Sequence, residues 1–311
     1  MVSRRRLGLG FVVLALGGCG SSSNALSPDA GDGAAVDGTG GDAADAGVVP
    51  FCGGFVMPNP AGAGLPNPAS YTVNGDGTIT DDVTGLVWEA AVDDTKYELT
   101  PAAEHCTQKG DGWRLPTRIE LVSLVDFTVA APGPTLDPVF GDTPDSTYWT
   151  SSGYYGVVDD EWYVGFDAGY SDYGIVNQPS LVRCVRAPAS TCVPRRYEPV
   201  AGGLVVDHAT GLTWQQKLDP GEYSWDDAIA YCKSLGAGWR MPSMKETQTI
   251  VDDRHEFPAV DPAAFPDTPS VDFWTGTPKA GGGGAAWYVD FFYGASDGDV
   301  ATRLFRVRCV R

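Results

Sequence analysis

The feature that most constrains this chain is an internal repeat. Residues Gly112 to Glu120 read GWRLPTRIE, and 126 residues later the chain reads GWRMPSMKE from Gly238 to Glu246. In both copies the pattern predicts a short strand that ends at a proline. The next residue is a threonine or serine, and a glutamate follows three positions later. That spacing is the capping box that begins a helix. The repeat therefore predicts two related domains in tandem.

The similarity extends far beyond this block. TGLVW at residues 84–88 returns as TGLTW at 210–214, and each copy closes on VRCVR, at 182–186 and 307–311. The offset between copies changes by a single residue after the block, which places the length difference in a loop. These observations indicate tandem duplication. We therefore place the first domain at residues 51–190 and the second at residues 191–311.

Residues 1–19 have the pattern of an export signal. Three arginines precede an apolar run from Leu7 to Leu16 that is too short to span a bilayer. The following Leu-Gly-Gly-Cys resembles the bacterial lipobox, which implies cleavage before Cys19 and lipidation of its thiol; an ordinary secretory signal is the alternative. Gly20 is not the aspartate that retains lipoproteins at the inner membrane. We therefore expect an exported protein that is anchored to lipid at the outer membrane or cell surface.

Residues 20–50 are predicted to be a disordered acidic tether. They contain mainly Gly, Ala, Ser and Asp, with no aromatic residue and no lysine or arginine. Such a segment cannot bury enough apolar surface to order itself, so it acts as a spacer. The whole chain has a formal net charge of −19, which opposes binding to other polyanions. We expect no nucleic-acid partner.

The cysteine count suits an exported protein. The chain has seven cysteines, and an even number remains once the lipidated one is set aside. Equivalent positions of the two repeats are the simplest partners, although six cysteines allow fifteen pairings in all. The predicted disulfides are Cys106–Cys184, Cys232–Cys309 and, between the entrances of the two repeats, Cys52–Cys192. No metal site is expected, because no Cys-x-x-Cys pair occurs and the chain has three histidines.

Each repeat is predicted to contain a hairpin region, two helices and then short aromatic strands, which is an α+β arrangement. Residues 74–77 (NGDG) predict a hairpin turn that the second repeat lacks. The first helix is expected to be capped by Thr100, with Pro101 at its first position, and its counterpart by Ser224. The second helix of the first repeat is predicted to bury Leu121, Leu124 and Val125.

Five motifs occur in the same order in both repeats: Thr-Gly-Leu-x-Trp, Trp-Arg-x-Pro-(Thr/Ser)-x-x-Glu, a Trp-Thr strand, Trp-Tyr-Val and Val-Arg-Cys-Val-Arg. Together they resemble the Lcl C-terminal domain family of exported bacterial domains, over about residues 71–187 and 196–311. The resemblance implies two tandem C-type-lectin-like domains, related also to the sulfatase-modifying-factor group. The namesake domain belongs to a surface adhesin that binds host glycans. The resemblance therefore implies attachment to a glycan or to an envelope or extracellular protein.

Some prominent residues are expected to have structural roles. Trp113 and Trp239 lie between glycine and arginine in the repeated block, so core packing is the preferred interpretation over a sugar-stacking surface. Arg114 and Arg240 are expected to pair with a nearby acid inside the protein, because a desolvated guanidinium requires a partner.

The candidate ligand-binding residues lie where the repeats differ and where polar residues meet aromatic ones. They are Tyr154, Tyr155, Asp159, Asp160, Tyr170, Asp172, Asp297 and Asp299. Carboxylates beside aromatic rings suit calcium or sugar hydroxyls, although solvated turns have the same composition. Gln178-Pro179-Ser180 lacks the acid of the calcium-dependent sugar-binding motif that it approaches. No cofactor is therefore expected, with calcium as the open alternative.

The sequence shows no recognisable set of catalytic residues. The three histidines occupy unrelated positions, and none recurs in the other repeat. His105 precedes Cys106, but a disulfide is the preferred role for that cysteine because Cys232 recurs without a histidine. The sulfatase-modifying enzymes use a reactive cysteine pair late in the domain, whereas Cys184 and Cys309 stand alone.

We therefore predict a lipid-anchored envelope protein that displays two non-catalytic lectin-like modules for surface binding or adhesion. A sulfatase-modifying-type oxidase and a purely structural envelope component are the two alternatives.

Overall fold

The structure is a computed structural model that describes residues 51–311 except 53–55, 156–159, 188–191 and 194. Of residues 51, 52, 192 and 193 it describes the backbone alone. The predicted signal and tether, residues 1–50, lie outside the described part. Within that part, no helix combines the length and apolar composition needed to cross a bilayer.

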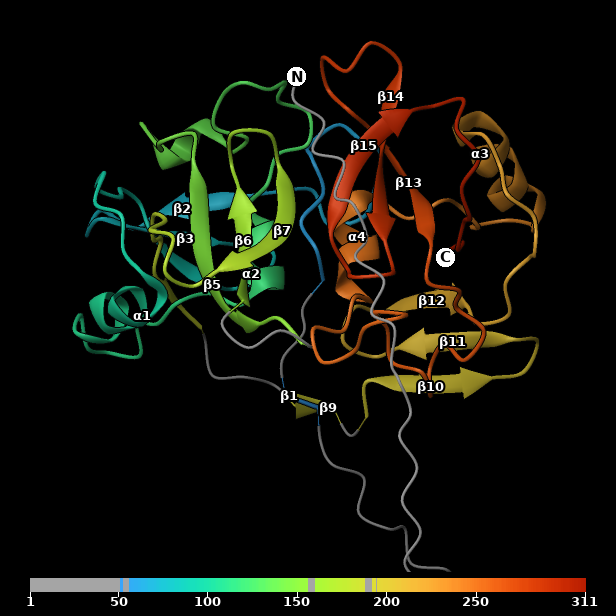
Figure 1. Cartoon of the computed structure of the whole chain (residues 1–311), viewed down its shortest axis with the longest axis horizontal. Coiled ribbons are helices and arrows are strands. Elements are labelled where there is room, and N and C mark those ends of the chain that lie inside the picture. Colours follow the sequence, from blue (N-terminus) through green and yellow to red (C-terminus); the bar gives the residue numbers. More distant parts are fainter. Residues whose placement is uncertain (1–50, 53–55, 156–159, 188–191, 194) are drawn as a thin grey trace, which may run out of the picture. The chain divides into compact units, whose positions relative to one another are not determined.

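The first repeat contains two antiparallel sheets and two α-helices (Figure 1). The first sheet has the order β2–β3–β4–β8, with β2 at Tyr71–Val73, β3 at Thr78–Asp81, β4 at Val87–Glu89 and β8 at Val185–Arg186. The helices are α1 (Leu99–Thr107) and α2 (Arg118–Ser123), and a short 3-10 helix η1 (Pro138–Phe140) follows. The second sheet consists of β5 (Thr147–Gly153), β6 (Asp160–Gly165) and β7 (Tyr170–Ile175).

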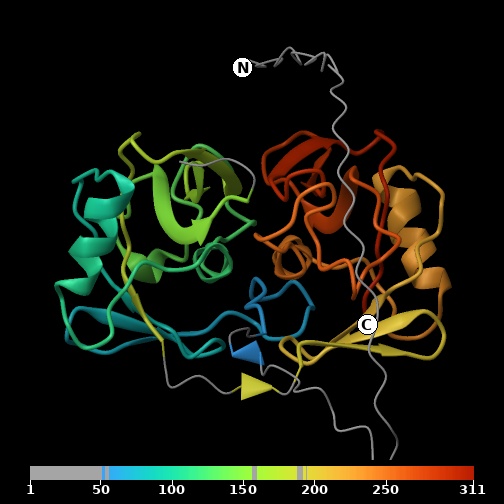
Figure 2. The same ribbon diagram turned by 60° about the horizontal axis from the view of Figure 1, so that its bottom comes forward.

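Apart from η1 and β8, the second repeat has the same order of elements (Figures 1 and 2). Its first sheet consists of β10 (Tyr197–Val200), β11 (Leu204–Asp207) and β12 (Leu212–Gln215). Helices α3 (Trp225–Ser234) and α4 (Met244–Thr249) follow. The second sheet consists of β13 (Asp272–Pro278), β14 (Ala285–Asp290) and β15 (Ser296–Val300). The α+β class and the tandem arrangement predicted from the sequence are confirmed.

The two intradomain disulfides are also confirmed. Cys106 is bonded to Cys184, and Cys232 is bonded to Cys309. The third predicted pair lies in a two-stranded ladder of β1 (Phe51–Cys52) and β9 (Cys192–Val193), where Cys52 stands directly opposite Cys192. The side chains of this pair lie outside the described part, so the Cys52–Cys192 disulfide stays a prediction.

The repeated block forms the predicted helix starts. Thr117 and Ser243 each accept a hydrogen bond from the amide of the glutamate three positions on, and that glutamate bonds back to the cap, so both capping boxes are complete. The same glutamates bind the arginines of the block through two hydrogen bonds each. The predicted internal arginine–acid pairs are Arg114–Glu120 and Arg240–Glu246.

Trp113 and Trp239 pack less deeply than predicted. Each is half-buried against a small cluster of apolar residues around its disulfide. The exposed ring face is covered by an arginine of the closing motif, Arg186 over Trp113 and Arg311 over Trp239. The fold thus shields these rings with a guanidinium rather than with further apolar side chains.

Two local predictions were wrong. Helix α1 begins at Leu99 with Glu98 as its N-cap, so Thr100 and Pro101 lie inside the first turn instead of starting it. The second repeat does have a hairpin, because β10 pairs with β11 through a turn at residues 201–203. Gly202 and Gly203 both adopt positive φ there, so glycine supplies the turn without the Asn-Gly signal.

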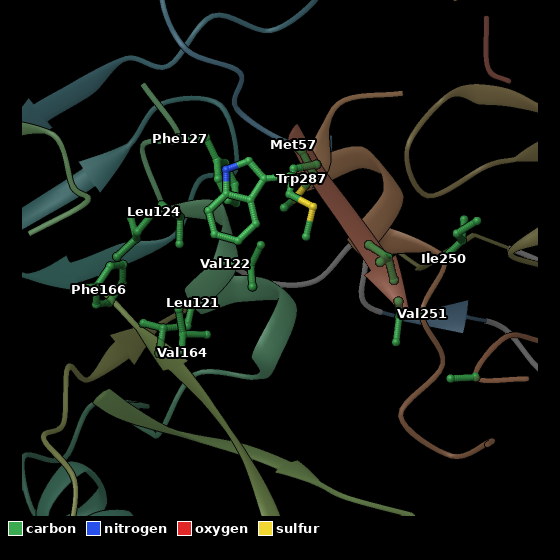
Figure 3. Close-up of a cluster of buried hydrophobic side chains, with 14 of the residues drawn as sticks. Met57, Leu121, Val122, Leu124, Phe127, Val164, Phe166, Ile250, Val251 and Trp287 are labelled. Atoms are coloured by element: carbon green, nitrogen blue, oxygen red, sulfur yellow. The ribbon is translucent and has the colours of Figure 1, made fainter. Parts of the chain in front are cut away.

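The two repeats share one apolar core. The largest group of buried apolar residues includes members of both second helices and both second sheets (Figure 3). Trp287 of β14 contacts Phe127 of the first repeat edge to face, with ring centroids 5.3 Å apart. Ser171 and Ser296, which occupy equivalent positions in the two repeats, are hydrogen-bonded to each other. Contact between equivalent residues is the signature of a two-fold, self-complementary interface.

Two cations of the helices α2 and α4 are buried at this interface. Arg118 of α2 donates hydrogen bonds to Asp253 and Gln248 of the second repeat. Lys245 of α4 donates to the carbonyl oxygen of Ser123 in the first repeat, at 2.6 Å. Burial lowers the pKa of the Lys245 ammonium to about 8. The interface is therefore held by apolar contacts together with hydrogen bonds, and each repeat donates hydrogen bonds to acceptors in the other.

Candidate functional site

An aromatic cluster joins the two repeats at the surface. Its members are Tyr154, Tyr173, Phe257, Phe292 and Tyr293, and we call them the aromatic cluster. Tyr154 stacks on Tyr173 with ring centroids 3.9 Å apart, and Tyr173 lies 5.8 Å from Tyr293. Phe257 and Phe292 meet edge to face at 4.3 Å. Rings from both repeats therefore form one contiguous group.

The phenylalanines of this cluster are exposed. The exposed fraction is 48% for Phe257 and 37% for Phe292, large values for rings that other rings already contact. Apolar rings gathered at a surface cost free energy in water, and such groups commonly mark a binding site.

The backbone at Phe257, whose ring is exposed, is strained. Its φ is +58°, in the left-handed region, which is unfavourable for a bulky residue. The conformation is held by hydrogen bonds from the amides of Phe257 and Ala259 to the carbonyl oxygens of Phe292 and Phe291. Strain of this kind costs roughly 1–3 kcal/mol and concentrates at functional sites.

The carboxylate of Glu256 lies beside the cluster. Burial raises the pKa of the Tyr154 phenol, with further contributions from Tyr173 and from the nearby Glu256. Carboxylates accept hydrogen bonds from hydroxyl groups, while aromatic faces cover the apolar faces of a ligand. This combination suits a ligand with both hydroxyl groups and flat apolar faces.

The structure brings one of the predicted site residues of the first repeat into the aromatic cluster. That residue is Tyr154, and it is itself buried under its neighbours. Tyr155, the next residue, is exposed. Asp160 lies on β6 opposite Ile175, and its carbonyl oxygen accepts the amide of Tyr154. Asp159 lies outside the described residues.

Tyr170 and Asp172 lie on β7, outside the cluster. Tyr170 contacts Tyr163 edge to face, and burial together with Asp167 and Asp172 raises its pKa to about 12. Asp172 stands opposite Tyr163 in the ladder, just as Asp297 stands opposite Tyr288 in the second repeat. The predicted equivalence of these two aspartates is confirmed.

Four members of the aromatic cluster were not predicted from the sequence. They are Tyr173, Phe257, Phe292 and Tyr293. The run Phe291-Phe292-Tyr293 directly after a strand was a usable signal, because three consecutive aromatic residues cannot all point into one core.

Aspartates gather on the second sheet of the second repeat. Asp272 of β13 stands directly opposite Asp290 of β14, and Asp297 and Asp299 follow on β15. Asp297 pairs with Lys279 at 3.4 Å and Asp299 with Arg303 at 3.1 Å. The predicted candidates Asp297 and Asp299 therefore both have cationic partners within the protein.

Asp272 makes the free energy of unfolding depend on pH. Burial, with Asp290 and Asp299 adding to it, raises the pKa of Asp272 to about 6. The folded protein then holds a proton that the unfolded chain would release, so this group's contribution to stability falls as pH rises through 6. Asp272→Asn is expected to raise the free energy of unfolding by about 1 kcal/mol near pH 7.5 and to leave it unchanged near pH 4. Urea denaturation at both pH values checks this, and a gain of equal size at both would contradict it.

A pocket of ≈ 330 Å³ lies beside the disulfide of the first repeat. A ring nitrogen of His105, a carboxylate oxygen of Glu89 and the sulfur of Cys184 lie within 4.8 Å of one another. This is the spacing of a metal site, but the sulfur is bonded to Cys106 and supplies no thiolate. The same disulfide confirms the preference for a cystine over a Cys-His nucleophile at Cys106.

Comparison with known proteins agrees with the resemblance noted in the sequence. The Lcl C-terminal domain family matches residues 77–186 and again residues 203–311. No curated protein matches the chain.

Proposed function

The chain belongs to the Lcl C-terminal domain family, in two tandem copies, and on this basis we propose that it is an exported, lipid-anchored and non-catalytic binding protein. Its two lectin-like modules act together, with the aromatic cluster as the surface that holds a glycan. Since rings of both repeats form the cluster, the site exists only in the tandem. This proposal explains why the two repeats share a core instead of being separated by a linker.

The observation that supports this function most is the exposure of Phe257 and Phe292 on a strained, hydrogen-bonded loop. Aromatic rings stack on the apolar faces of sugars, and nearby carboxylates accept their hydroxyl groups. The carboxylate of Glu256 and the net charge of −19 oppose sulfated and other anionic glycans. The expected ligand is therefore a neutral or amino-bearing glycan.

The anchor is part of the same proposal. Cys19 follows an apolar signal and precedes a segment without aromatic residues, an arrangement that suits a lipid attachment with a spacer. Such a spacer would hold the binding surface away from the membrane. Cys19→Ser is expected to move the protein from the membrane fraction to the soluble fraction on cell fractionation. Retention of the variant in the membrane would refute lipidation at this cysteine.

Glycan binding can be tested on an array of neutral, amino-bearing and sulfated oligosaccharides, followed by titration calorimetry with the strongest binder. Phe257→Ala and Phe292→Ala are each expected to weaken binding at least about tenfold, because each removes an exposed stacking face. Leu304→Ala is the matched control, since Leu304 is an exposed apolar residue of the second repeat outside the cluster. Absence of glycan binding by the unaltered protein, or full binding by both phenylalanine variants, would refute the proposal.

A further inference from the structure

The pocket of the first repeat is lined by charged groups of both signs. It lies between the segment that follows β4 and the region of helix α1. Its principal lining residues are Glu89, Asp93, Tyr97, His105, Lys109 and Val182. The basic members come from α1 and the residues just after it, and the acidic members come from β4 and its continuation. The pocket therefore carries charges of both signs, and two of them, Glu89 and Lys109, form an ion pair with each other.

These groups are held in place by the fold. One oxygen of Glu89 accepts the amide of Cys184 at 2.8 Å, and the other lies 2.6 Å from the ammonium of Lys109. The His105 ring lies against Tyr97, with centroids 4.9 Å apart. Lys109 has two further donors beyond the one directed at Glu89. The pocket is thus pre-formed and still has hydrogen-bonding capacity.

The second repeat shows that the fold does not require these charges. Gln215 occupies the position of Glu89, and its side-chain oxygen accepts the amide of Cys309 at 2.9 Å. Tyr231 replaces His105, stacks on Tyr223 and accepts a hydrogen bond from Gln215. Leu235 replaces Lys109. The same backbone bond beside the equivalent disulfide is therefore made by a neutral set, so the charged residues of the first repeat are not required for that bond.

We propose that this pocket binds a small zwitterion of amino-acid size. The anionic group of the ligand faces Lys109 and His105, its ammonium group faces Glu89 and Asp93, and its apolar part lies against Val182. The volume is at the lower end of the range for ligand sites, which limits the ligand to a small molecule. A zwitterion matches lining groups of both signs, because Lys109 keeps further donors beyond its bond to Glu89 and the carboxylate of Asp93 is exposed on the acidic side. This inference is independent of the proposed glycan site.

The test is calorimetric titration of the full chain with each of the twenty standard amino acids. At least one is expected to bind saturably. For that amino acid, the N-acetylated form, which lacks the ammonium, and the amide form, which lacks the carboxylate, are each expected to bind at least tenfold more weakly. A triple variant, Glu89→Gln with His105→Tyr and Lys109→Leu, installs the residues of the second repeat and is expected to lose binding by at least tenfold.

The triple variant has a built-in folding control, because the same three residues stand beside an intact disulfide in the second repeat. Its melting temperature and glycan binding are expected to match those of the unaltered protein. The proposal is overturned if none of the twenty amino acids binds. Equal binding of the charge-deleted analogues, or undiminished binding by the folded triple variant, overturns it as well.

Discussion

Replacing Cys232 and Cys309 together with alanine is expected to lower the free energy of unfolding by about 4 kcal/mol. The bond closes a loop between residues 77 positions apart, so its removal greatly increases the conformational freedom of the unfolded chain. Both cysteines are fully buried, and the small cluster of apolar residues around them would lose packing as well. This loss is a large part of the stability of a typical domain.

The first repeat provides a matched comparison. The Cys106–Cys184 bond closes a loop with a separation of 78 residues, so Cys106→Ala with Cys184→Ala should cost nearly the same. Denaturation in guanidinium chloride, followed by tryptophan fluorescence under oxidising conditions, gives both values. A cost below about 1 kcal/mol for either pair would contradict the loop-closure argument.

The duplication made much of the fold predictable. A disulfide has no local sequence signal, but each of the two confirmed pairs has a counterpart at the equivalent position of the other repeat. The capping boxes and the pairs Arg114–Glu120 and Arg240–Glu246 were predictable for a different reason. Their partners lie within six residues of each other along the chain, so the local turn from an extended segment into the first turn of the helix brings them together.

The contacts between the repeats could not be predicted in this way. Arg118 donates a hydrogen bond to Asp253, which lies 135 positions further along the chain. The residue equivalent to Arg118 in the second repeat is the apolar Met244. Repeat comparison reveals what two domains have in common, whereas an interface between them depends on where they differ. The aromatic cluster was not predicted for the same reason, since Tyr154 stacks on Tyr173 within the first repeat, and Tyr173 contacts Tyr293 only because the two repeats pack together.

Arg118→Met is expected to lower the free energy of unfolding by about 3 kcal/mol. Arg118 is 1% exposed, its Nε lies 2.7 Å from a carboxylate oxygen of Asp253, and its guanidinium covers the ring of Trp162. Methionine matches much of the side-chain volume and already occupies the equivalent buried position in the second repeat. The substitution therefore removes the cation with little change in packing, and it leaves the carboxylate of Asp253 and the side chain of Gln248 without their donor.

The matched control is Arg254→Met, because Arg254 pairs with Asp252 at 2.8 Å but its side chain is 80% exposed. An exposed pair contributes less than about 1 kcal/mol, so this variant should be almost as stable as the unaltered protein. Adding Asp253→Asn to Arg118→Met should recover part of the loss, since the unpaired negative charge is then absent. Urea denaturation of the unaltered protein and these three variants measures the differences in the free energy of unfolding. If Arg118→Met costs no more than Arg254→Met, the buried cation does not hold the two repeats together.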